Sequence, residues 1–434
     1  MPPLRSILLS AVLLALPVVA SAQAGASLNM SIDEAARLAT RWFEEGRPEE
    51  ARRMVKLLRA TPEPHPQILF LSGQLAMADG DFRLAVSEFR RLLSEDPSLI
   101  RVRLELARAL YELRDFDAAR YHFELALGED VPEAARANIQ GFLQRIRSQI
   151  SSYSLSAMLV PDSNVNQSTR AETVDVLGRT FTLNGDARAK SALGLALVGQ
   201  SRHAFGGEHR SFVRTYLEHR EYPARYADFS FLQVTLGHSL QQGPSTWTLE
   251  AGPLASIYQD KGLYRGGMAQ LSHGRPLGRS LWLNQSLNWK QLDYPDYTYL
   301  SGHQTWLGHD LRYAINRTSV ASLSLWLGKS RAAESAYGYQ AAEWKIGYLK
   351  ELGRGFTVEL RLAGSRFDYS GESPLFGEVR HDREGRVEVD ITRRDWSWRG
   401  FAPKLTLTHT DHRSNLPLYS YRRTYLGLGV TREF

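Results

Sequence analysis

Four residues near the C-terminus carry side chains that hydrolytic catalysis uses. His409, Asp411, His412 and Ser414 could supply a base, an acid and a nucleophile. However, they lie in a segment with the alternating pattern of a β-strand, in which neighbouring side chains point to opposite faces. His409 and His412 are therefore expected to diverge, and a triad is recognised by its geometry rather than by closeness in sequence. We expect no catalytic site here.

The rest of the chain offers little for other chemistry. His303 and His309 lack a spacing typical of metal ligands, and no phosphate-binding loop or dinucleotide fingerprint is present. The chain has no cysteine, which excludes disulfides, thiol chemistry and lipid attachment to a cysteine after a signal. The net charge of +6 comes from scattered residues, so no nucleic-acid partner is indicated. We expect no enzyme, no metal and no cofactor.

The most distinctive short segment runs from Pro161 to Asn166. Pro161 ends a predicted strand, and the side chains that follow can cap a turn by bonding to the backbone. Two interpretations stay open: a well-made turn, or a gate or substrate contact near the mouth of a pore. The candidate residues for the second interpretation are Pro161, Asp162, Ser163, Asn164 and Asn166.

The N-terminus has the features of a secretory signal peptide. Arg5 precedes an apolar run that ends near Ala20, and overlapping small-residue cleavage patterns follow up to Ala24. We assign residues 1–24 to the signal and expect export from the cytoplasm. No later stretch is apolar enough for a transmembrane helix, so a membrane location would require a closed barrel.

A helical repeat with a period of 34 residues follows the signal. Residues in one repeat match those 34 positions later, as in the pairs Phe82 and Phe116, Ala85 and Ala119, Phe89 and Phe123, and Leu93 and Leu127. Such a period is typical of tetratricopeptide repeats. We expect about three repeats and a final helix near 132–150, which together form a periplasmic α-solenoid at 25–150.

The groove of such a solenoid usually binds a peptide or another protein. Candidate groove residues on the first helix of each repeat are Gln74, Arg103 and Arg108. The alternative is that these polar side chains only solvate a surface.

Short alternating strands replace the helices after residue 150. Fourteen strands are predicted, at about 152–161, 189–202, 210–221, 227–240, 245–258, 263–275, 280–292, 301–313, 318–330, 338–350, 356–367, 385–394, 401–411 and 422–434. Apolar edges such as Leu193, Leu195 and Leu197 alternate with charged edges such as Arg386, Glu388 and Asp390. A soluble sandwich can show the same alternation.

Three observations favour a transmembrane barrel over a sandwich. Short turns alternate with longer links, among them 162–188, 259–262, 368–384 and 412–421. The even strand count puts both barrel ends on the periplasmic side. Aromatic residues crowd strand ends as interfacial girdles do, including Trp247, Trp282, Trp289, Trp306, Tyr313, Trp326 and Tyr348. We expect a 14-stranded antiparallel outer-membrane barrel at 151–434, in a two-domain α + β chain.

The charged edge of the predicted strands faces the barrel interior. It carries both signs, for example Arg361 beside Glu359 and Lys404 near Asp390. Mixed signs indicate internal salt bridges rather than an ion-selective channel.

The chain ends on an alternating strand whose last residue is Phe434. Outer-membrane barrels end in this way, and a barrel-assembly machine would recognise such an end. We expect this closing strand to pair with the one that begins near Tyr153.

As an ordered set, these segments resemble the surface lipoprotein assembly modifier (Slam) family, the outer-membrane component of type XI secretion. The set comprises the signal, the short solenoid, the run from Pro161 to Asn166 and the fourteen strands. The resemblance implies a translocon that carries lipoproteins, or related secreted binding proteins, to the cell surface without cofactor or catalytic residues. For such a protein we expect the repeats to receive the client or its periplasmic chaperone. We expect the client to leave through the lumen or through a lateral opening between the first and last strands.

Two other functions stay open at this point. A polysaccharide-export porin also joins periplasmic repeats to a barrel, but typically has many more repeats and a lumen biased to one charge. A host-contact or adhesion barrel would act through its loops, at 162–188, 368–384 and 412–421.

Overall fold

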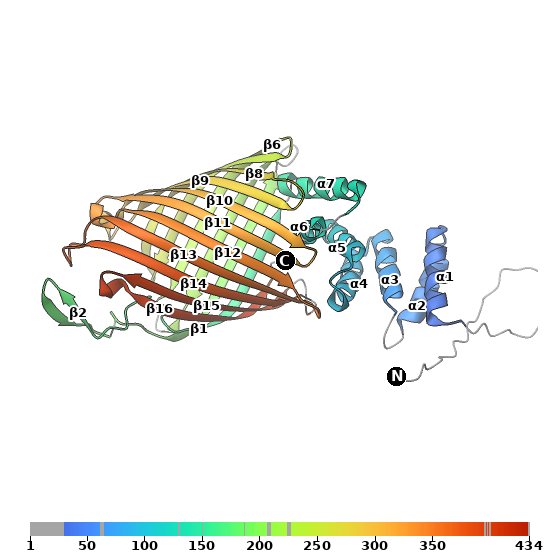
Figure 1. Cartoon of the computed structure of the whole chain (residues 1–434), viewed down its shortest axis with the longest axis horizontal. Coiled ribbons are helices and arrows are strands. Elements are labelled where there is room, and N and C mark those ends of the chain that lie inside the picture. The colour runs from blue at the N-terminus through green and yellow to red at the C-terminus, as the bar shows by residue number, and fades with distance from the viewer. Residues whose placement is uncertain are drawn as a thin grey trace, which may run out of the picture. The chain divides into compact units, whose positions relative to one another are not determined.

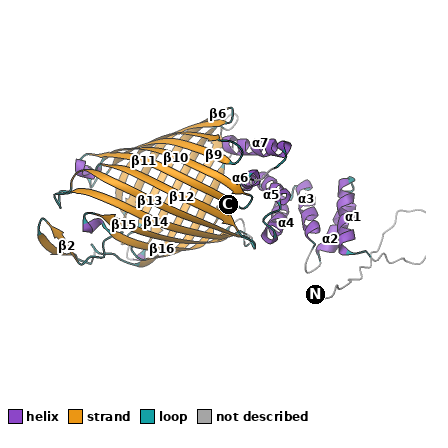
Figure 2. Cartoon of the chain, in the orientation of Figure 1, coloured by secondary structure: helices purple, strands orange, loops and turns teal. Residues whose placement is uncertain are grey.

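The protein changes from helices to strands between Gln149 and Ser152 (Figure 2). This computed structural model describes residues 30–60, 65–128, 131–149, 151–185, 187–205, 210–223, 227–394, 396, 398 and 401–432. The predicted signal peptide and Phe434 lie outside these residues. Two compact units divide the chain, the first ending at Leu92 and the second beginning at Leu93. The predicted domain limits 25–150 and 151–434 stay a prediction.

The described helices form three helix–turn–helix pairs and one further helix, as the 34-residue period predicts. They are α1 (Ile32–Glu44), α2 (Pro48–Arg59), α3 (Pro66–Ala78), α4 (Phe82–Glu95), α5 (Ile100–Glu112), α6 (Phe116–Leu127) and α7 (Glu133–Gln149). None of these helices has both the length and the apolar character that crossing a membrane requires.

Small residues let the helices of the first unit pack closely. Ala36, Ala39 and Ala51 are fully buried between α1 and α2. A Cβ atom on Gly73 of α3 would lie 2.4 Å from the ring of Phe89 on α4, so only glycine fits at this crossing. The repeat pattern therefore reflects the requirement for close helix contact.

Fourteen antiparallel strands close into a barrel, and the predicted number is confirmed (Figure 1). The barrel order is β1-β16-β15-β14-β13-β12-β11-β10-β9-β8-β7-β6-β5-β4. The strands are β1 (Ser152–Asp162), β4 (Ala192–Phe205), β5 (Ser211–Glu221), β6 (Phe229–Gln242), β7 (Ser245–Tyr258), β8 (Lys261–Pro276), β9 (Leu281–Asp293), β10 (Gly302–Asn316), β11 (Ser319–Ala332), β12 (Tyr339–Glu351), β13 (Phe356–Glu372), β14 (Val379–Arg393), β15 (Ala402–Ser414) and β16 (Tyr421–Thr431).

The outer face of the barrel is apolar. Leu193 and Leu195 are half exposed, as are Leu360, Leu362 and other large apolar side chains at alternate positions. A continuous apolar face of this kind suits a hydrocarbon surrounding. The apolar edge of the strands therefore faces outward, as the sequence predicts.

The aromatic assignment needs a correction. Trp247, Trp289, Tyr313 and Tyr348 lie on the outer face. Trp306 alternates with the outward Leu307, and Trp326 packs where a Cβ on Gly308 would lie, so both tryptophans point inward. Trp282 likewise lines an interior cavity. These three residues fill the interior instead of forming a girdle. Inward glycines make room for two of the rings, Gly328 for Trp306 and Gly308 for Trp326.

Three of the predicted links named above are shorter in the structure, and the one at 412–421 shrinks to 415–420. The link at 259–262 is a two-residue turn, in which Gln259 and Asp260 both have positive φ. The link at 368–384 shrinks to 373–378, because β13 and β14 extend beyond their predicted ends. In these extensions His381 contacts Asp368 at 2.8 Å, and Asp368 also contacts Arg366, which lies in the predicted part of β13, at 2.7 Å.

The longest link carries a small hairpin that the sequence pattern did not predict. Its strands are β2 (Thr173–Val176) and β3 (Arg179–Thr182), joined by a turn in which Leu177 and Gly178 have positive φ. Val174 and Val176 pack against Phe376 and Leu416 from two other links. We call this end of the barrel the loop end, and the end where β1 begins and β16 stops the turn end.

Candidate functional site

The segment from Pro161 to Asn166 lies at the loop end, where the first and last strands meet. Pro161 and Asp162 end β1, and Asp162 is buried. Its carboxylate accepts hydrogen bonds from Arg423 Nε of β16 at 2.9 and 3.1 Å and from the Tyr222 hydroxyl at 3.1 Å. Burial, together with the Asp162 carboxylate, raises the pKa of Tyr222 to about 12, so this hydroxyl stays protonated and donates.

Further contacts join the segment to β16. Ser163 exchanges two hydrogen bonds with Thr424: its backbone N–H donates at 3.0 Å, and its hydroxyl accepts from the Thr424 N–H at 2.7 Å. The fully buried Asn164 donates to the Arg422 carbonyl at 3.1 Å and bonds both backbone groups of Ser168. We call Asp162, Ser163, Asn164, Tyr222 and Arg423 the seam clasp.

Asn166 has a different role from the seam clasp. Its amide donates to the Arg188 carbonyl at 2.8 Å and accepts from the Lys190 N–H at 3.0 Å. Asn166 thus fastens the two ends of the link between β1 and β4 to each other. The polar groups of the segment form hydrogen bonds within the protein, so the segment is part of the barrel wall. Its role as a gate stays a prediction.

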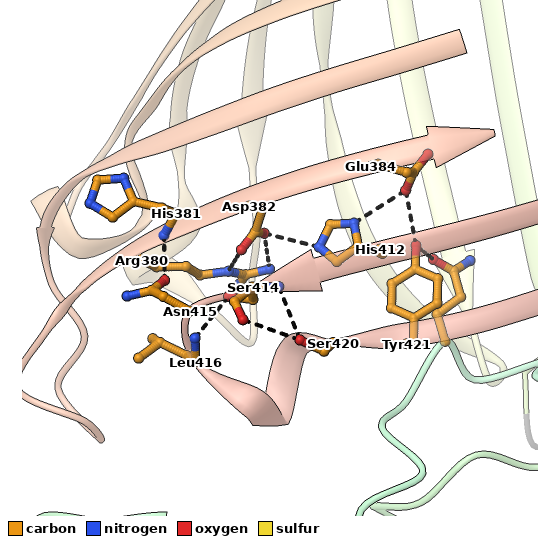
Figure 3. A network of polar contacts seen from close by, with 11 residues as sticks. Arg380, His381, Asp382, Glu384, His412, Ser414, Asn415, Leu416, Ser420 and Tyr421 are labelled. Carbon is orange, nitrogen blue, oxygen red and sulfur yellow. Dashed lines mark hydrogen bonds and ion pairs between the residues drawn. The ribbon is translucent and has the colours of Figure 1, made fainter. Parts of the chain in front are cut away.

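A second polar network lies beside the clasp, on β14 to β16 (Figure 3). His412 places one ring nitrogen 3.1 Å from Asp382 and the other 3.2 Å from Glu384. Its ring stacks on Tyr421, with 4.8 Å between ring centroids. The Tyr421 hydroxyl contacts Glu384 at 3.3 Å and Gln167 at 3.2 Å, which links this network to the chain after β1.

His409 and His412 do diverge, as the strand pattern predicts. His409 is exposed and contacts Thr424 at 2.9 Å, whereas His412 is buried in the network. Both ring nitrogens of His412 contact carboxylates, so neither activates the Ser414 hydroxyl. The four residues give no catalytic triad.

At the turn end, α6 packs inside the barrel. Tyr121 and Leu125 of α6 form an apolar cluster with Val320 of β11 and Leu349 of β12. Arg394 lies over the Tyr121 ring at 4.5 Å. Burial, and next the Glu351 carboxylate, raise the pKa of Tyr121, which keeps this hydroxyl neutral.

Ion pairs hold the same helices to the wall. Arg103 Nη2 of α5 lies 2.6 Å from Glu351 of β12, and Glu124 of α6 lies 3.3 Å from Arg312 of β10. Ser280 donates to the Leu127 carbonyl at 3.2 Å. Helices α5 and α6 therefore dock on β10, β11 and β12 through both apolar and charged contacts.

The predicted groove residues have three different surroundings. Gln74 is half-buried on α3, and Arg108 is exposed on α5, where it pairs with Glu105 at 3.0 Å. Arg103 is fully buried and paired with Glu351, so its assignment to an open groove is wrong. The long Arg103 side chain extends to the barrel wall, and a repeat pattern alone contains no information about this contact.

The interior wall pairs charges of both signs, as the sequence predicts. Arg361 contacts Glu359, Glu388 and Asp390, and Lys404 lies 3.2 Å from Asp390. Cavities of about 430 and 450 Å³ border α6, and Arg120 lines both. Charged side chains line both spaces, among them Arg361 and Asp390 in the first and Glu124 and Arg312 in the second.

The partners of these residues were not foreseen. In the sequence Arg423 falls within the last predicted strand, whereas Tyr222 and Glu351 lie just outside predicted strands, and nothing marked any of them as a partner. Only the register between distant strands brings them to the clasp and to α5.

Both the helical part and the strand part of the chain match models of known protein families. A family model described as surface lipoprotein assembly modifier matches residues 152–434. A second, described as the N-terminal TPR repeats of surface lipoprotein assembly modifier, matches residues 34–123.

Three relatives align over most of the chain. Surface lipoprotein assembly modifier 1 of Neisseria meningitidis is 22% identical over 84% of this chain and 75% of its own length. The Haemophilus influenzae protein of the same name is 23% identical over 88% of this chain and 80% of its own length. The hemophilin secretion modulator of Acinetobacter baumannii is 24% identical over 84% of this chain and 78% of its own length.

Proposed function

Because the chain belongs to the surface lipoprotein assembly modifier family, we propose that it carries client proteins across the outer membrane to the cell surface. The clients are lipoproteins or related soluble binding proteins. The names of the relatives support both client classes, since one set refers to surface lipoproteins and one to hemophilin secretion.

The docking of α5 and α6 inside the turn end is the observation that carries this proposal. A client-binding solenoid whose last pair of helices packs on the interior wall can pass a client directly to the lumen. The inner wall offers charged and polar side chains, which satisfy the hydrogen bonds of an unfolded chain as lipid could not. The barrel lies in the outer membrane with its solenoid on the periplasmic side.

Other parts of the proposal concern partners and processing. The solenoid at 25–150 meets the client or its periplasmic chaperone, and the barrel-assembly machinery recognises the C-terminal strand. A signal peptide at 1–24 directs export. The sequence contains no phosphate-binding loop for ATP, so the proposal takes client folding outside the cell as the driving force.

Surface biotinylation followed by mass spectrometry tests the function on all surface proteins at once, so that no client has to be chosen beforehand. A strain that lacks the gene should lose one or a few proteins from the cell surface while they accumulate inside. Expression of the whole chain should restore them, and expression of a chain without 25–150 should not, although the barrel is inserted. An unchanged set of surface proteins would contradict the proposed function.

The same strains separate the alternatives. Loss of surface polysaccharide with normal surface proteins would favour an export porin. Loss of binding to host cells with normal display of all proteins would favour an adhesion barrel.

A further inference from the structure

Among the residues that the structure describes, the contact between β1 and β16 has the fewest paired positions of any seam in the barrel. It joins five positions, of which four run from Ser156 to Leu159 and one is Asp162. Every other pair of neighbouring barrel strands is paired at ten to fourteen positions.

The described part of β16 ends at Thr431, so residues 152–155 of β1 lie beyond it, and this accounts for four of the six positions at which β1 pairs with β4 but not with β16. The other two positions are an interruption within the ladder. The same β1 pairs with β4 at eleven positions, and the same β16 pairs with β15 at eleven. The interruption falls at Val160 and Pro161, between the paired Leu159 and Asp162. Because proline has no N–H group, it removes one ladder hydrogen bond at this point.

In the described part of the seam, the side-chain hydrogen bonds between β1 and β16 lie near its two ends. At the turn end, the buried Ser156 hydroxyl donates to Thr431 at 2.8 Å. At the loop end, the seam clasp joins Asp162 to Arg423. Between them the inward positions of β16 include Gly427 and Gly429, and a Cβ on Gly429 would lie 2.0 Å from the Ala157 carbonyl oxygen. Glycine permits close backbones here, but it adds no side chain that bridges the strands.

We propose that the barrel parts between β1 and β16, and that the acyl chains of a lipid-anchored client pass through this opening. The acyl chains stay in the hydrocarbon of the membrane, while the attached polypeptide follows the polar lumen. Parting this seam exposes fewer backbone groups to lipid than parting any other, because fewer are paired across it. The inference rests on the proposed function and assigns a route to its lipid-bearing clients.

Paired cysteines test the route, since the chain has none of its own. Leu159 faces Leu428 across the seam and Leu195 across the neighbouring pair of strands, and all three lie on the outer face. The variant L159C/L428C locks the seam by a disulfide, and L159C/L195C is its matched control. Gel mobility with and without reductant gives the fraction locked.

The probe is the lipoprotein found by surface biotinylation, together with its form whose lipid-bearing cysteine is replaced by alanine. With the seam locked, display of the lipidated probe should fall about tenfold or more, because its acyl chains have no exit. Reductant should restore display. The control disulfide should leave display normal, and the form without lipid should still reach the outside.

Three results would overturn the route. These are normal display of the lipidated probe with the seam fully locked, an equal loss in the control, and an equal loss of the form without lipid. Failure of the proposed function is a separate result, because it shows as unchanged surface proteins in the strain that lacks the gene.

Discussion

The Arg103 guanidinium on α5 and the Glu351 carboxylate on β12 form an ion pair of 2.6 Å that is almost closed to solvent. Arg103 is fully buried and also donates to the Pro97 carbonyl at 2.6 Å. Removing one partner of such a pair leaves a buried charge without compensation, which costs about 3–5 kcal/mol. The docked position of α5 and α6 therefore depends on both partners.

The first prediction concerns this dock. Arg103→Ala leaves Glu351 unpaired and should weaken docking by about 3 kcal/mol, or about a hundredfold in the ratio of docked to undocked protein. The barrel should then conduct ions more often, which single-channel recordings in planar bilayers measure.

Arg108→Ala is the matched control, because Arg108 lies on the same helix but is exposed and pairs only with its neighbour Glu105. It should conduct as the unchanged protein does. Equal conductance of the Arg103 and Arg108 variants would contradict a docking role for the buried pair.

The second prediction concerns the seam clasp. Asp162→Ala removes the partner of Arg423, whose side chain is mostly buried, and should destabilise the barrel by about 3 kcal/mol. The melting temperature of the purified barrel, read from heat-modified gel mobility, should fall. Asp411→Ala is the control, since Asp411 pairs with the exposed Arg413, and pairs of this kind contribute about 0–1 kcal/mol. Equal melting temperatures for both variants would count against the clasp.

The strand count was predictable because the wall has a solvent-like inside and a lipid-like outside. Each strand must alternate to satisfy both, so Leu360 and Arg361 reveal their faces from sequence alone. Link lengths were less predictable. Charged residues in the extensions, such as Asp368 and His381, have the composition of a loop, although they pair across β13 and β14.

The partners of the site residues could not be predicted from the sequence. Asp162 lies 60 positions from Tyr222 and 261 positions from Arg423, and strand register decides which of many inward residues it meets. For the same reason Arg103 was predicted to be a groove residue. Its place on the first helix of a repeat is correct, but its partner lies on β12, and the repeat pattern contains no information about that strand.

The third prediction concerns the helix crossing at Gly73. Gly73→Ala puts a methyl group into the space of the Phe89 ring and should destabilise the helical unit by about 1–3 kcal/mol. Thermal unfolding followed by far-ultraviolet circular dichroism measures the change. Gly141→Ala on α7 is the control, because its Cβ would meet only the far end of Arg145 at 4.0 Å, and it should raise stability by about 0.5–1 kcal/mol. A stabilising Gly73→Ala would contradict the close crossing.

The last prediction concerns the C-terminal residue, Phe434. Strand β16 pairs with β15 on one side and β1 on the other, so it is the strand that closes the wall. The ladder continues to Arg432, since Thr431 pairs with Ser156 and the Arg432 N–H donates to the Leu155 carbonyl at 2.9 Å. Deleting Phe434 should impair barrel insertion, because assembly then lacks its terminal aromatic residue, while the helices at 31–150 stay folded. Heat-modified mobility of outer-membrane fractions measures insertion, and protease resistance measures the helices. Phe434→Tyr retains an aromatic ring and should insert normally. Normal insertion of the deletion variant would argue against recognition of this end by an assembly machine.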